Sequence, residues 1–332
     1  MLERHGELTG RGTALGMWPQ ALRALDTIGL GEQVRATGVR QREMTFRRSD
    51  GSTLARMDVG RLERSSGDLP VLISRAALIR LLATALPAEL VRLNTSVSPG
   101  DLDRLRAEYD VVIGADGIRS AVRSAFGGAP KLRYSGYTAW IGLVPGDGEA
   151  SQEILGRGAK FGVTPAEDGM TNWYAPVWAP PDFPLSELRS RFEGWCDPVG
   201  PLLARSLSEP DAGTEILRNA VHYLAPPPRG YVHGTVALLG DAAHAMTADL
   251  GQGACQALVD GVTLGRSLTS GDAVEVALRR YDRLRRRPAQ HVATAAKWLG
   301  RLTMYPPLAA VRNGVFRTAG LAGPRERSTT RA

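Results

Sequence analysis

The spacing of hydrophobic residues predicts two helices in the first quarter of the chain. After Pro19, apolar residues recur at helical spacing up to Gly29, so residues 19–28 are predicted to form a helix with proline at its start and glycine past its end. A second row with this spacing follows Ser74, whose hydroxyl is expected to cap the helix. The residues expected to face inward there are Leu78, Leu81, Leu82 and Ala85.

Two continuous apolar runs, residues 111–115 and 235–239, predict buried strands of a parallel sheet. The first run ends in Asp116-Gly117 and the second is followed by Gly240-Asp241. A helix is predicted after each, the second from about residue 253 to residue 268. Because ligands of α/β folds usually bind at the carboxyl edge of the parallel strands, these two junctions are the candidate binding segments.

Shorter strand-like runs fill other parts of the chain. Residues 43–48 and 53–57 flank Asp50-Gly51, which is a strong hairpin signal. Residues 131–224 hold short runs rich in Trp, Tyr, Val and Thr, broken by Gly and Pro. This pattern predicts a mainly antiparallel sheet with one amphipathic helix around residues 185–195.

The order of these patterns predicts an α/β fold with two domains. The first domain is expected to be discontinuous and to combine residues 1–130 with residues 225–332, of which the part after residue 268 is expected to be helical up to about residue 321. The inserted domain is expected to be residues 131–224, where Trp140, Trp173, Tyr174 and Trp178 form either a wall for a planar ligand or ordinary core.

Composition narrows the class of protein. With 332 residues and 43% hydrophobic residues, the chain has enough apolar material for one large core or two. No apolar run approaches the roughly 18 to 20 residues that cross a bilayer, and the first residues resemble neither a signal peptide nor a transit sequence. The cytoplasm is therefore the expected location. Cys196 and Cys255 lack metal-ligand spacing and are expected to be small core residues.

The net charge of +7 raises the question of a nucleic-acid partner. Arginines are spread along the whole chain, which is unlike a binding stripe, so no nucleic-acid partner is expected. The one dense cluster, residues 279–287, lies in a helical stretch that is expected to end at Pro288. A solvated helix face is the preferred interpretation of this cluster, and attraction of anionic lipid or substrate is the alternative.

The segments 110–123 and 240–254 together resemble the group A flavoprotein monooxygenases, such as para-hydroxybenzoate hydroxylase and salicylate hydroxylase. A lone Asp-Gly is ordinarily a turn or a helix cap. Two long matches in the right order are more specific, and the likeness extends over nearly the whole chain. The resemblance implies an FAD-binding Rossmann-like domain, an inserted antiparallel substrate domain at residues 131–224, and C-terminal helices.

The resemblance also implies roles for residues of the second segment. Gly240 and Asp241 match the family turn in which the aspartate accepts hydrogen bonds from the ribityl chain of FAD. Gly251, Gln252 and Gly253 match the loop that brings backbone close to the isoalloxazine. The helix that starts there would direct its positive end at the flavin and stabilise the negative charge of the reduced form.

Other residues are assigned to the cofactor in the same way. Asp116 and Gly117 match a fingerprint linked to FAD and nicotinamide binding, and Arg75 matches an arginine that often lies against the cofactor. Arg119 and Arg123 are candidates for phosphate contacts or for solvent-facing positions on a helix.

The first residues carry a conditional assignment. Glu3 and Arg4 resemble the end of the family's second strand, where the acidic residue binds the ribose of the adenosine. The glycine-rich turn that precedes this strand should lie roughly 30 residues upstream, before Met1. The first strand and helix of the family's cofactor domain are therefore expected to be absent from this chain.

The implied reaction is oxygen transfer. FAD would be reduced by NADH or NADPH and would react with O2 to form the C4a-hydroperoxide, which hydroxylates or epoxidises an aromatic or polyene small molecule. No side chain is assigned as catalytic: His244 is expected to hold its loop by hydrogen bonds, and the sequence has neither a metal-ligand cluster nor a Ser-His-Asp pattern.

Three readings stay open at this point. In the first, Met1 is not the true start and the protein is a complete monooxygenase. In the second, the chain is a truncated, cofactor-poor and non-catalytic homologue that acts as a binding protein. In the third, it belongs to a related flavin class, such as a prenyl-chain reductase or a halogenase, although the halogenase element Trp-x-Trp-x-Ile-Pro is absent.

Overall fold

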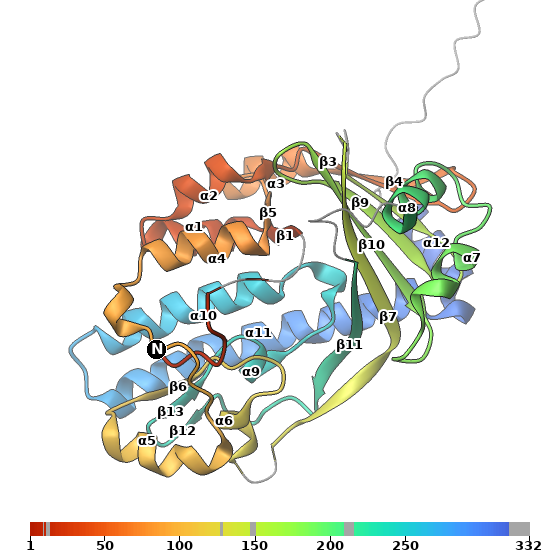
Figure 1. Ribbon diagram of the computed structural model, residues 1–332. Helices are drawn as coiled ribbons and strands as arrows, with labels where there is room; N and C mark the ends of the chain where they lie inside the picture. Colours follow the sequence, from red (N-terminus) through yellow and green to blue (C-terminus); the bar gives the residue numbers. More distant parts are fainter. Residues whose placement is uncertain (9, 11–13, 127–128, 147–150, 209–215, 319–332) are drawn as a thin grey trace, which may run out of the picture. The chain divides into compact units, whose positions relative to one another are not determined.

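A computed structural model describes residues 1–8, 10, 14–126, 129–146, 151–208 and 216–318 (Figure 1). The chain divides into two compact units, each of which is described by itself. Unit 1 comprises Met1–Val39, Val71–Ser135 and Ala220–Gly300, and unit 2 comprises Arg40–Pro70, Gly136–Asn219 and Arg301–Ala332.

The two predicted buried strands are neighbours in unit 1. They are β6 (Val112–Gly114) and β13 (Val236–Leu238), which pair in parallel, and β12 (Val232–His233) lies on the other side of β13. β13 is buried along its length, as expected, but Ile113 in β6 is 45% exposed. The pairing confirms the prediction that both runs belong to one parallel sheet and end at the same edge.

A second small sheet of unit 1 supports the first helices. Its order is β1 (Ala14–Met17), β5 (Val71–Ser74) and β2 (Val39–Arg40). The predicted helix at residues 19–28 is α1 (Pro19–Thr27). Gly29 follows with a φ of 76°, a backbone conformation that favours glycine.

The helix after Ser74 is α4 (Arg75–Thr84), and the Ser74 hydroxyl accepts a hydrogen bond from the backbone N–H of Ala77 at 3.1 Å. The predicted cap is therefore confirmed. Ala85 was expected to face inward, but it is exposed because it lies past the end of the helix as the C-cap residue.

Two longer helices complete the core of unit 1. They are α10 (Gly253–Leu268), with the predicted bounds, and α11 (Val274–Met304), which lie beside each other in Figure 1. The expected stop at Pro288 is wrong, because α11 continues through it. An interior proline disfavours a helix by about 3 kcal/mol, and the buried row on the inner face offsets this. That row consists of Ala277, Tyr281, Arg285, Ala289 and Ala296.

Shorter elements connect these parts. The remaining helices and single turns of unit 1 are α2 (Gly31–Thr37), η1 (Ala88–Leu90), η2 (Pro99–Asp101), α5 (Leu102–Glu108), α6 (Ala121–Ser124), α9 (Asp241–His244) and η4 (Ala248–Leu250). The helix predicted after the first buried run is thus only the short α6.

Unit 2 is built on a seven-stranded sheet, two strands of which continue into unit 1. The order is β11 (Leu217–Ala225), β7 (Lys131–Pro145), β10 (Met170–Trp178), β9 (Lys160–Pro165), β8 (Ser151–Leu155), β3 (Glu43–Arg48) and β4 (Thr53–Asp58). Strands β7, β10, β9 and β8 follow one another antiparallel, whereas β3 pairs with β8 in parallel. The mainly antiparallel sheet and the hairpin at Asp50-Gly51 were predicted correctly.

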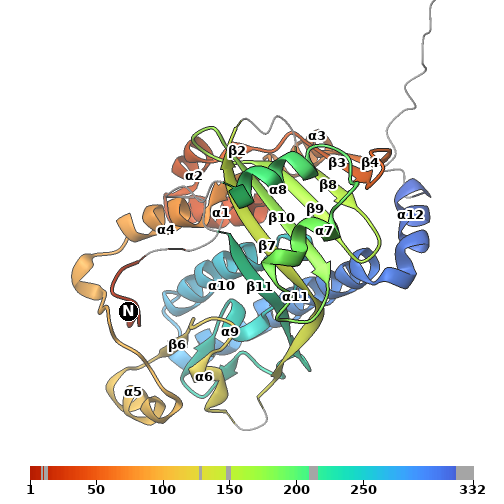
Figure 2. The same ribbon diagram turned by 45° about the vertical axis from the view of Figure 1, so that its right-hand side comes forward.

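Helices cover one face of this sheet (Figure 2). The single helix expected around residues 185–195 is instead η3 (Leu185–Glu187) followed by the short α7 (Leu188–Arg191), and α8 (Val199–Ser208) was not predicted. The other helices are α3 (Val59–Ser66), η5 (Pro306–Leu308) and α12 (Ala309–Thr318).

The division of the chain differs from the expected one. Residues 40–70 and the segment after residue 300 group with the sheet domain and not with the first domain. The reason is pairing that is remote in sequence: β3 extends the sheet beside β8, and Phe316 of α12 packs on Phe46 of β3 with ring centroids 5.2 Å apart.

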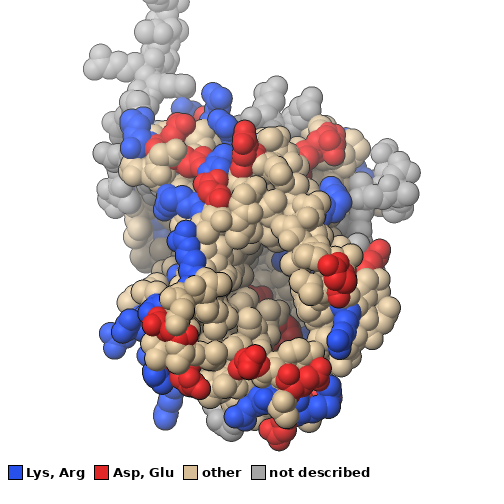
Figure 3. All heavy atoms as spheres, turned by 90° about the vertical axis from the view of Figure 1, so that its left-hand side faces the viewer, with Lys and Arg blue, Asp and Glu red and all other residues tan. Residues whose placement is uncertain are grey.

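The distribution of charged side chains on the surface agrees with the spread of arginines along the sequence. On the face shown in Figure 3, basic and acidic side chains are interspersed. Within the described ranges, no helix is long and apolar enough to span a membrane, and no group of three or more His, Cys, Asp or Glu side chains is arranged to hold a metal ion. Cys255 is buried, as expected, and Cys196 is half-buried.

Candidate functional site

The two predicted junctions meet at one edge of the sheet in unit 1. The backbone N–H of Leu239 donates to the carbonyl of Gly114 at 3.1 Å, so the segments that follow β6 and β13 start side by side. Arg123 fixes them to each other. Its buried guanidinium donates to the carbonyls of Ile118 at 2.5 Å and Ala242 at 2.9 Å. Arg123 is therefore not a solvent-facing residue, and its guanidinium is bound to backbone carbonyls of both junctions.

Asp116 is engaged by the protein itself. Its carboxylate accepts hydrogen bonds from the Ser120 hydroxyl at 2.5 Å and from the backbone N–H groups of Ala121 and Val122 at 2.6 and 3.2 Å, so it caps α6. Gly117 follows with a φ of 78°, and no atom lies near the position of a Cβ there. The backbone around Gly117 is thus the part of this junction that is open to a ligand.

The second junction presents a carboxylate that the protein leaves available. Gly240 has a φ of 58°, and a Cβ there would lie 3.1 Å from Cβ of Ala257. Asp241 begins α9 at the surface, and in the described part of the chain its carboxylate makes no hydrogen bond or ion pair. Desolvation by the surrounding protein raises the pKa of Asp241, against the charges of His244, Arg75 and Arg123. Such a group gains from any hydroxyl donor that reaches it.

The start of α10 is a second open feature. Gly251 ends η4 in the left-handed region with a φ of 60°, and Gln252 is the N-cap residue of the helix but makes no capping bond with its side chain. The side-chain oxygen of Gln252 instead accepts from the amide of Gln20 at 2.6 Å. Next to Gly253 the position of a Cβ is empty. The positive end of this 16-residue helix is therefore not covered by a capping side chain.

Arg75 belongs to the same neighbourhood. It is the exposed first residue of α4, and its positive charge acts on the carboxyl of Asp241. The structure thus brings Arg75, Asp241 and the two junctions together.

Glu3 and Arg4 lie on another segment. The backbone N–H of Glu3 donates to the carbonyl of Arg92 at 2.9 Å, next to a parallel bridge between Leu2 and Arg92. The Glu3 carboxylate accepts from the backbone of His5 at 2.9 Å; burial opposes its ionisation, but the bonds and charge of His5 outweigh burial and lower its pKa. Arg4 is exposed. Among the residues with a described position, no hydrogen bond or ion pair links Glu3 or Arg4 to Asp116 or Asp241.

Sequence reasoning missed a buried polar network beneath the second junction. Asp260 of α10 accepts from the backbone N–H of Gly240 at 2.9 Å and lies 2.6 Å from Nε2 of His244. Arg285 of α11 donates to the other carboxylate oxygen of Asp260 at 2.6 Å and to the side chain of Gln256 at 2.6 Å. His244 thus holds its loop, as expected.

One signal for these residues is visible in retrospect. Gln256, Asp260 and Leu264 follow one another at four-residue intervals on the buried side of α10. Tyr281, Arg285 and Ala289 do the same on α11. A single charged residue within each buried row indicates a buried ion pair, since an unpaired charge is rarely buried. The interpretation of the arginine cluster as a solvated face is therefore wrong for Arg285.

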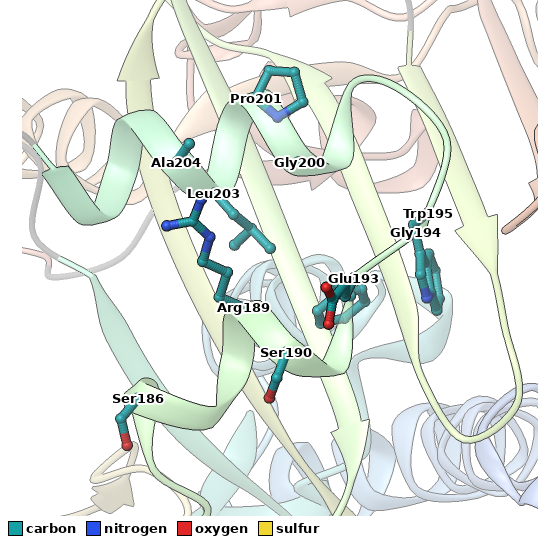
Figure 4. A pocket seen from close by; sticks show the side chains of 11 residues that line it. Ser186, Arg189, Ser190, Glu193, Gly194, Trp195, Gly200, Pro201, Leu203 and Ala204 are labelled. Atoms are coloured by element: carbon teal, nitrogen blue, oxygen red, sulfur yellow. The ribbon is translucent and has the colours of Figure 1, made fainter.

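A pocket of about 670 Å³ lies elsewhere, in unit 2 (Figure 4). It is formed by α7, α8 and the segment that connects them, and Arg189, Glu193 and Trp195 are among its lining residues. Most of these side chains are exposed, and none of the residues predicted to bind a cofactor is among them.

The aromatic residues of the sheet divide into two groups. Trp173 is fully buried, stacks on Phe161 with ring centroids 5.7 Å apart and donates to the Ser206 hydroxyl, so it is core. Tyr174 points to the opposite face, is half-buried, and donates its hydroxyl to Glu153 at 2.8 Å. Of the four aromatic residues considered as a wall for a planar ligand, Tyr174 and Trp178 are half-buried, whereas Trp140 and Trp173 are buried.

Parallel strands that end in glycine-aspartate turns, next to an uncovered helix N-terminus, define a nucleotide-cofactor domain of the α/β class. Residues 211–296 match the model of a family described as FAD binding domain. The chain is 32% identical to the aurachin C monooxygenase/isomerase of Stigmatella aurantiaca, over 91% of this chain and 82% of that protein. It is 33% identical to the 3-amino-4-hydroxybenzoate 2-monooxygenase of Streptomyces cremeus, over 86% and 76% of the two chains.

Comparison of the fold with solved structures points to the same kind of protein. The crystal structure of Klebsiella pneumoniae HpxO with FAD and uric acid superposes with a TM-score of 0.83 at 26% identity, over 95% of this chain and 85% of that one. The chain belongs to the FAD-dependent monooxygenases of the para-hydroxybenzoate hydroxylase type.

The residues at the sheet edge fit the cofactor of this family. An available carboxylate at Asp241 suits a polyol chain, which supplies hydroxyl donors. An uncapped helix start next to two glycines suits an electron-rich ring system and phosphates, because both accept from backbone N–H groups.

Proposed function

We propose that the chain is an FAD-containing, NAD(P)H-dependent monooxygenase that hydroxylates or epoxidises an aromatic or polyene small molecule. In this reaction one atom of O2 enters the substrate, the other leaves as water, and the two electrons required come from NADH or NADPH. The observation that carries the proposal is the carboxylate of Asp241, which makes no hydrogen bond or ion pair within the described residues, beside the uncapped start of α10. When bound, FAD would supply the activation of O2 and the transfer of oxygen.

The site residues receive their roles from this arrangement. Asp241 would accept hydrogen bonds from the ribityl chain, and the turn at Gly240 would hold it in place. The backbone of Gly251, Gln252 and Gly253, with the positive end of α10, would stabilise negative charge on the reduced ring. The remaining assignments are Asp116 and Gly117 in the fingerprint linked to FAD and nicotinamide binding, Arg75 against the cofactor, and Glu3 with Arg4 for the ribose of the adenosine.

An aromatic substrate is favoured by two observations. Uric acid is bound in the HpxO crystal structure, and 3-amino-4-hydroxybenzoate is named in the second relative. In unit 2, the half-buried ring of Tyr174 lies opposite Ile141 in the strand register and donates its hydroxyl to Glu153, so this face of the sheet offers an aromatic ring beside polar side chains. Exclusion of water and orientation of the substrate are the tasks that remain for the protein.

The test compares FAD retention with turnover. The purified chain is incubated with FAD, desalted, and measured by visible absorbance, and NAD(P)H oxidation is then followed with aromatic candidates while the oxygenated product is identified. We expect retained flavin in the wild type and loss of retention in Asp241→Asn. The control Asp103→Asn removes an aspartate whose side chain is 99% exposed and should retain flavin like the wild type. Retained flavin without any oxygenated product would favour the non-catalytic binding protein or a flavin reductase.

A further inference from the structure

One carboxylate holds both ends of the short helix that begins with Asp241. Asp260, which has no exposed surface, accepts from the backbone N–H of Gly240 at 2.9 Å with Oδ2, and the same oxygen lies 2.6 Å from Nε2 of His244. Gly240 is the N-cap residue of α9 and His244 is its last residue. A carboxylate only accepts hydrogen bonds, so His244 carries a proton on Nε2.

Arg285 connects this turn to the start of α10. Its Nε donates to Oδ1 of Asp260 at 2.6 Å, and its Nη2 donates to the side-chain oxygen of Gln256 at 2.6 Å. Gln256 lies one turn into α10, and its backbone N–H donates to the carbonyl of the N-cap residue Gln252 at 2.9 Å. The network therefore joins the two segments that are proposed to bind FAD.

The buried ion pair between Asp260 and Arg285 is better explained by its effect on the geometry of the turn than by a gain in the free energy of unfolding. Burial opposes the ionisation of Asp260, but the hydrogen bonds from His244 and Gly240 and the charge of Arg285 outweigh it and lower its pKa. A buried ion pair of this kind is often no more stabilising than apolar residues of the same volume. Its advantage is directional, because every bond has a defined donor and acceptor.

We propose that Asp260 and Arg285 are positioning residues for the cofactor. Asp260 keeps Gly240 in its positive-φ conformation, which directs the Asp241 carboxylate, and Arg285 fixes Asp260 relative to the start of α10. The role toward FAD rests on the proposed function above, whereas the ordering of the turn does not require any cofactor. Neither residue touches the reacting atoms in this proposal.

The test measures the turn and the cofactor separately. Amide hydrogen exchange of residues 240–244 is followed in the apo-protein, and FAD affinity is measured by quenching of flavin fluorescence. Loss of a hydrogen bond to a charged group changes an equilibrium by roughly 10- to 100-fold. We expect Asp260→Asn to speed exchange in this segment at least tenfold and to weaken FAD binding by a similar factor.

Two controls separate positioning from general destabilisation. Arg286→Gln removes the neighbouring, partly exposed arginine that pairs with Asp282, and it should change neither quantity. Leu30→Ala opens a cavity in a separate buried cluster that contains none of residues 240–244, and it lowers stability. Its FAD affinity, measured where the variant is folded, should stay within about twofold of the wild type; a loss as large as that of Asp260→Asn overturns the proposal.

If Asp260→Asn does not fold, a milder variant tests the positioning role. Arg285→Lys keeps the charge but lacks the planar guanidinium whose Nε and Nη2 bind Asp260 and Gln256 in fixed directions. It should weaken FAD binding about tenfold while retaining a wild-type fold by circular dichroism, and unchanged exchange and affinity would overturn the proposal. If the wild type binds no FAD but the turn still exchanges faster in these variants, the proposed function fails and the positioning of the turn stands.

Discussion

The guanidinium of Arg123 lies against the carbonyl of Ala242 at 2.9 Å, although the two residues are 119 positions apart in the chain. Arg123 follows the first junction and Ala242 follows the second, so one buried side chain ties together the two segments that carry the family resemblance.

Replacement of Arg123 by methionine should destabilise the protein and weaken FAD retention. The carbonyls of Ile118 and Ala242 would lose their buried donor, and bonds to a charged group contribute about 1.5–3 kcal/mol each. We expect the free energy of unfolding in urea to fall by about 2–4 kcal/mol. Arg119→Gln, at an exposed position of the same segment, should change it by less than about 0.5 kcal/mol. Equal effects of the two variants would refute the role given to Arg123.

Asp260 should make stability fall in acid. Its folded pKa is below the ordinary value of about 3.9, so its contribution is complete above the unfolded pKa and is lost as the pH falls through the folded pKa. The difference in unfolding free energy between wild type and Asp260→Asn should be constant above about pH 5 and shrink below about pH 4. Unfolding in urea at a series of pH values measures it, and a difference that grows in acid contradicts the assignment.

Asp241 should have the opposite effect on the pH dependence of stability. Its folded pKa is raised, so ionisation opposes folding, and stability is lost as the pH rises from the unfolded to the folded pKa. Without FAD, Asp241→Asn should therefore melt at or above the wild-type temperature at neutral pH. With FAD, the wild type should gain more in melting temperature than the variant, because ligand binding to the folded state stabilises it by mass action. A variant that melts lower in both states would show that Asp241 is structural.

Gly240→Ala should weaken the site through its backbone. The left-handed φ disfavours any residue with a Cβ by about 1–3 kcal/mol, and here the added Cβ also approaches Ala257. Gly271 is the matched control, since its φ of 82° is also positive but the space around it is empty. Thermal unfolding should show a larger loss for Gly240→Ala than for Gly271→Ala, and FAD retention should fall only in the former.

Local patterns predicted much of unit 1 correctly. The bounds of α10, the cap at Ser74 and the parallel pairing of the two apolar runs depend on periodicity and end signals, which nearby residues determine. The stop at Pro288 failed because the cost of one proline is smaller than the packing of a long buried face. A rule based on neighbouring residues cannot weigh the cost of the proline against the packing of the whole helix.

Most of the features that the sequence did not predict are contacts between residues that are far apart in the chain. Asp260 and Arg285 are 25 positions apart and pair only because two helices lie side by side. The addition of β3 to the sheet requires pairing with β8, and Arg47 of β3 reaches Gln152 of β8 across 105 positions. The individual helices and strands could be predicted from the sequence, but tertiary packing determines which of them contact each other.

The short parallel pair β6–β13 also bears on how enzymes of this type change over time. The chain that connects the two strands holds most of the sheet of unit 2. The entropy of closing such a loop grows only with the logarithm of its length, so doubling it changes stability by about 0.6 kcal/mol. Insertions, deletions and exchanges between the strands are therefore inexpensive for the cofactor turn. The chain between the two strands can therefore change in length while the pairing that positions the two glycine-aspartate turns stays the same.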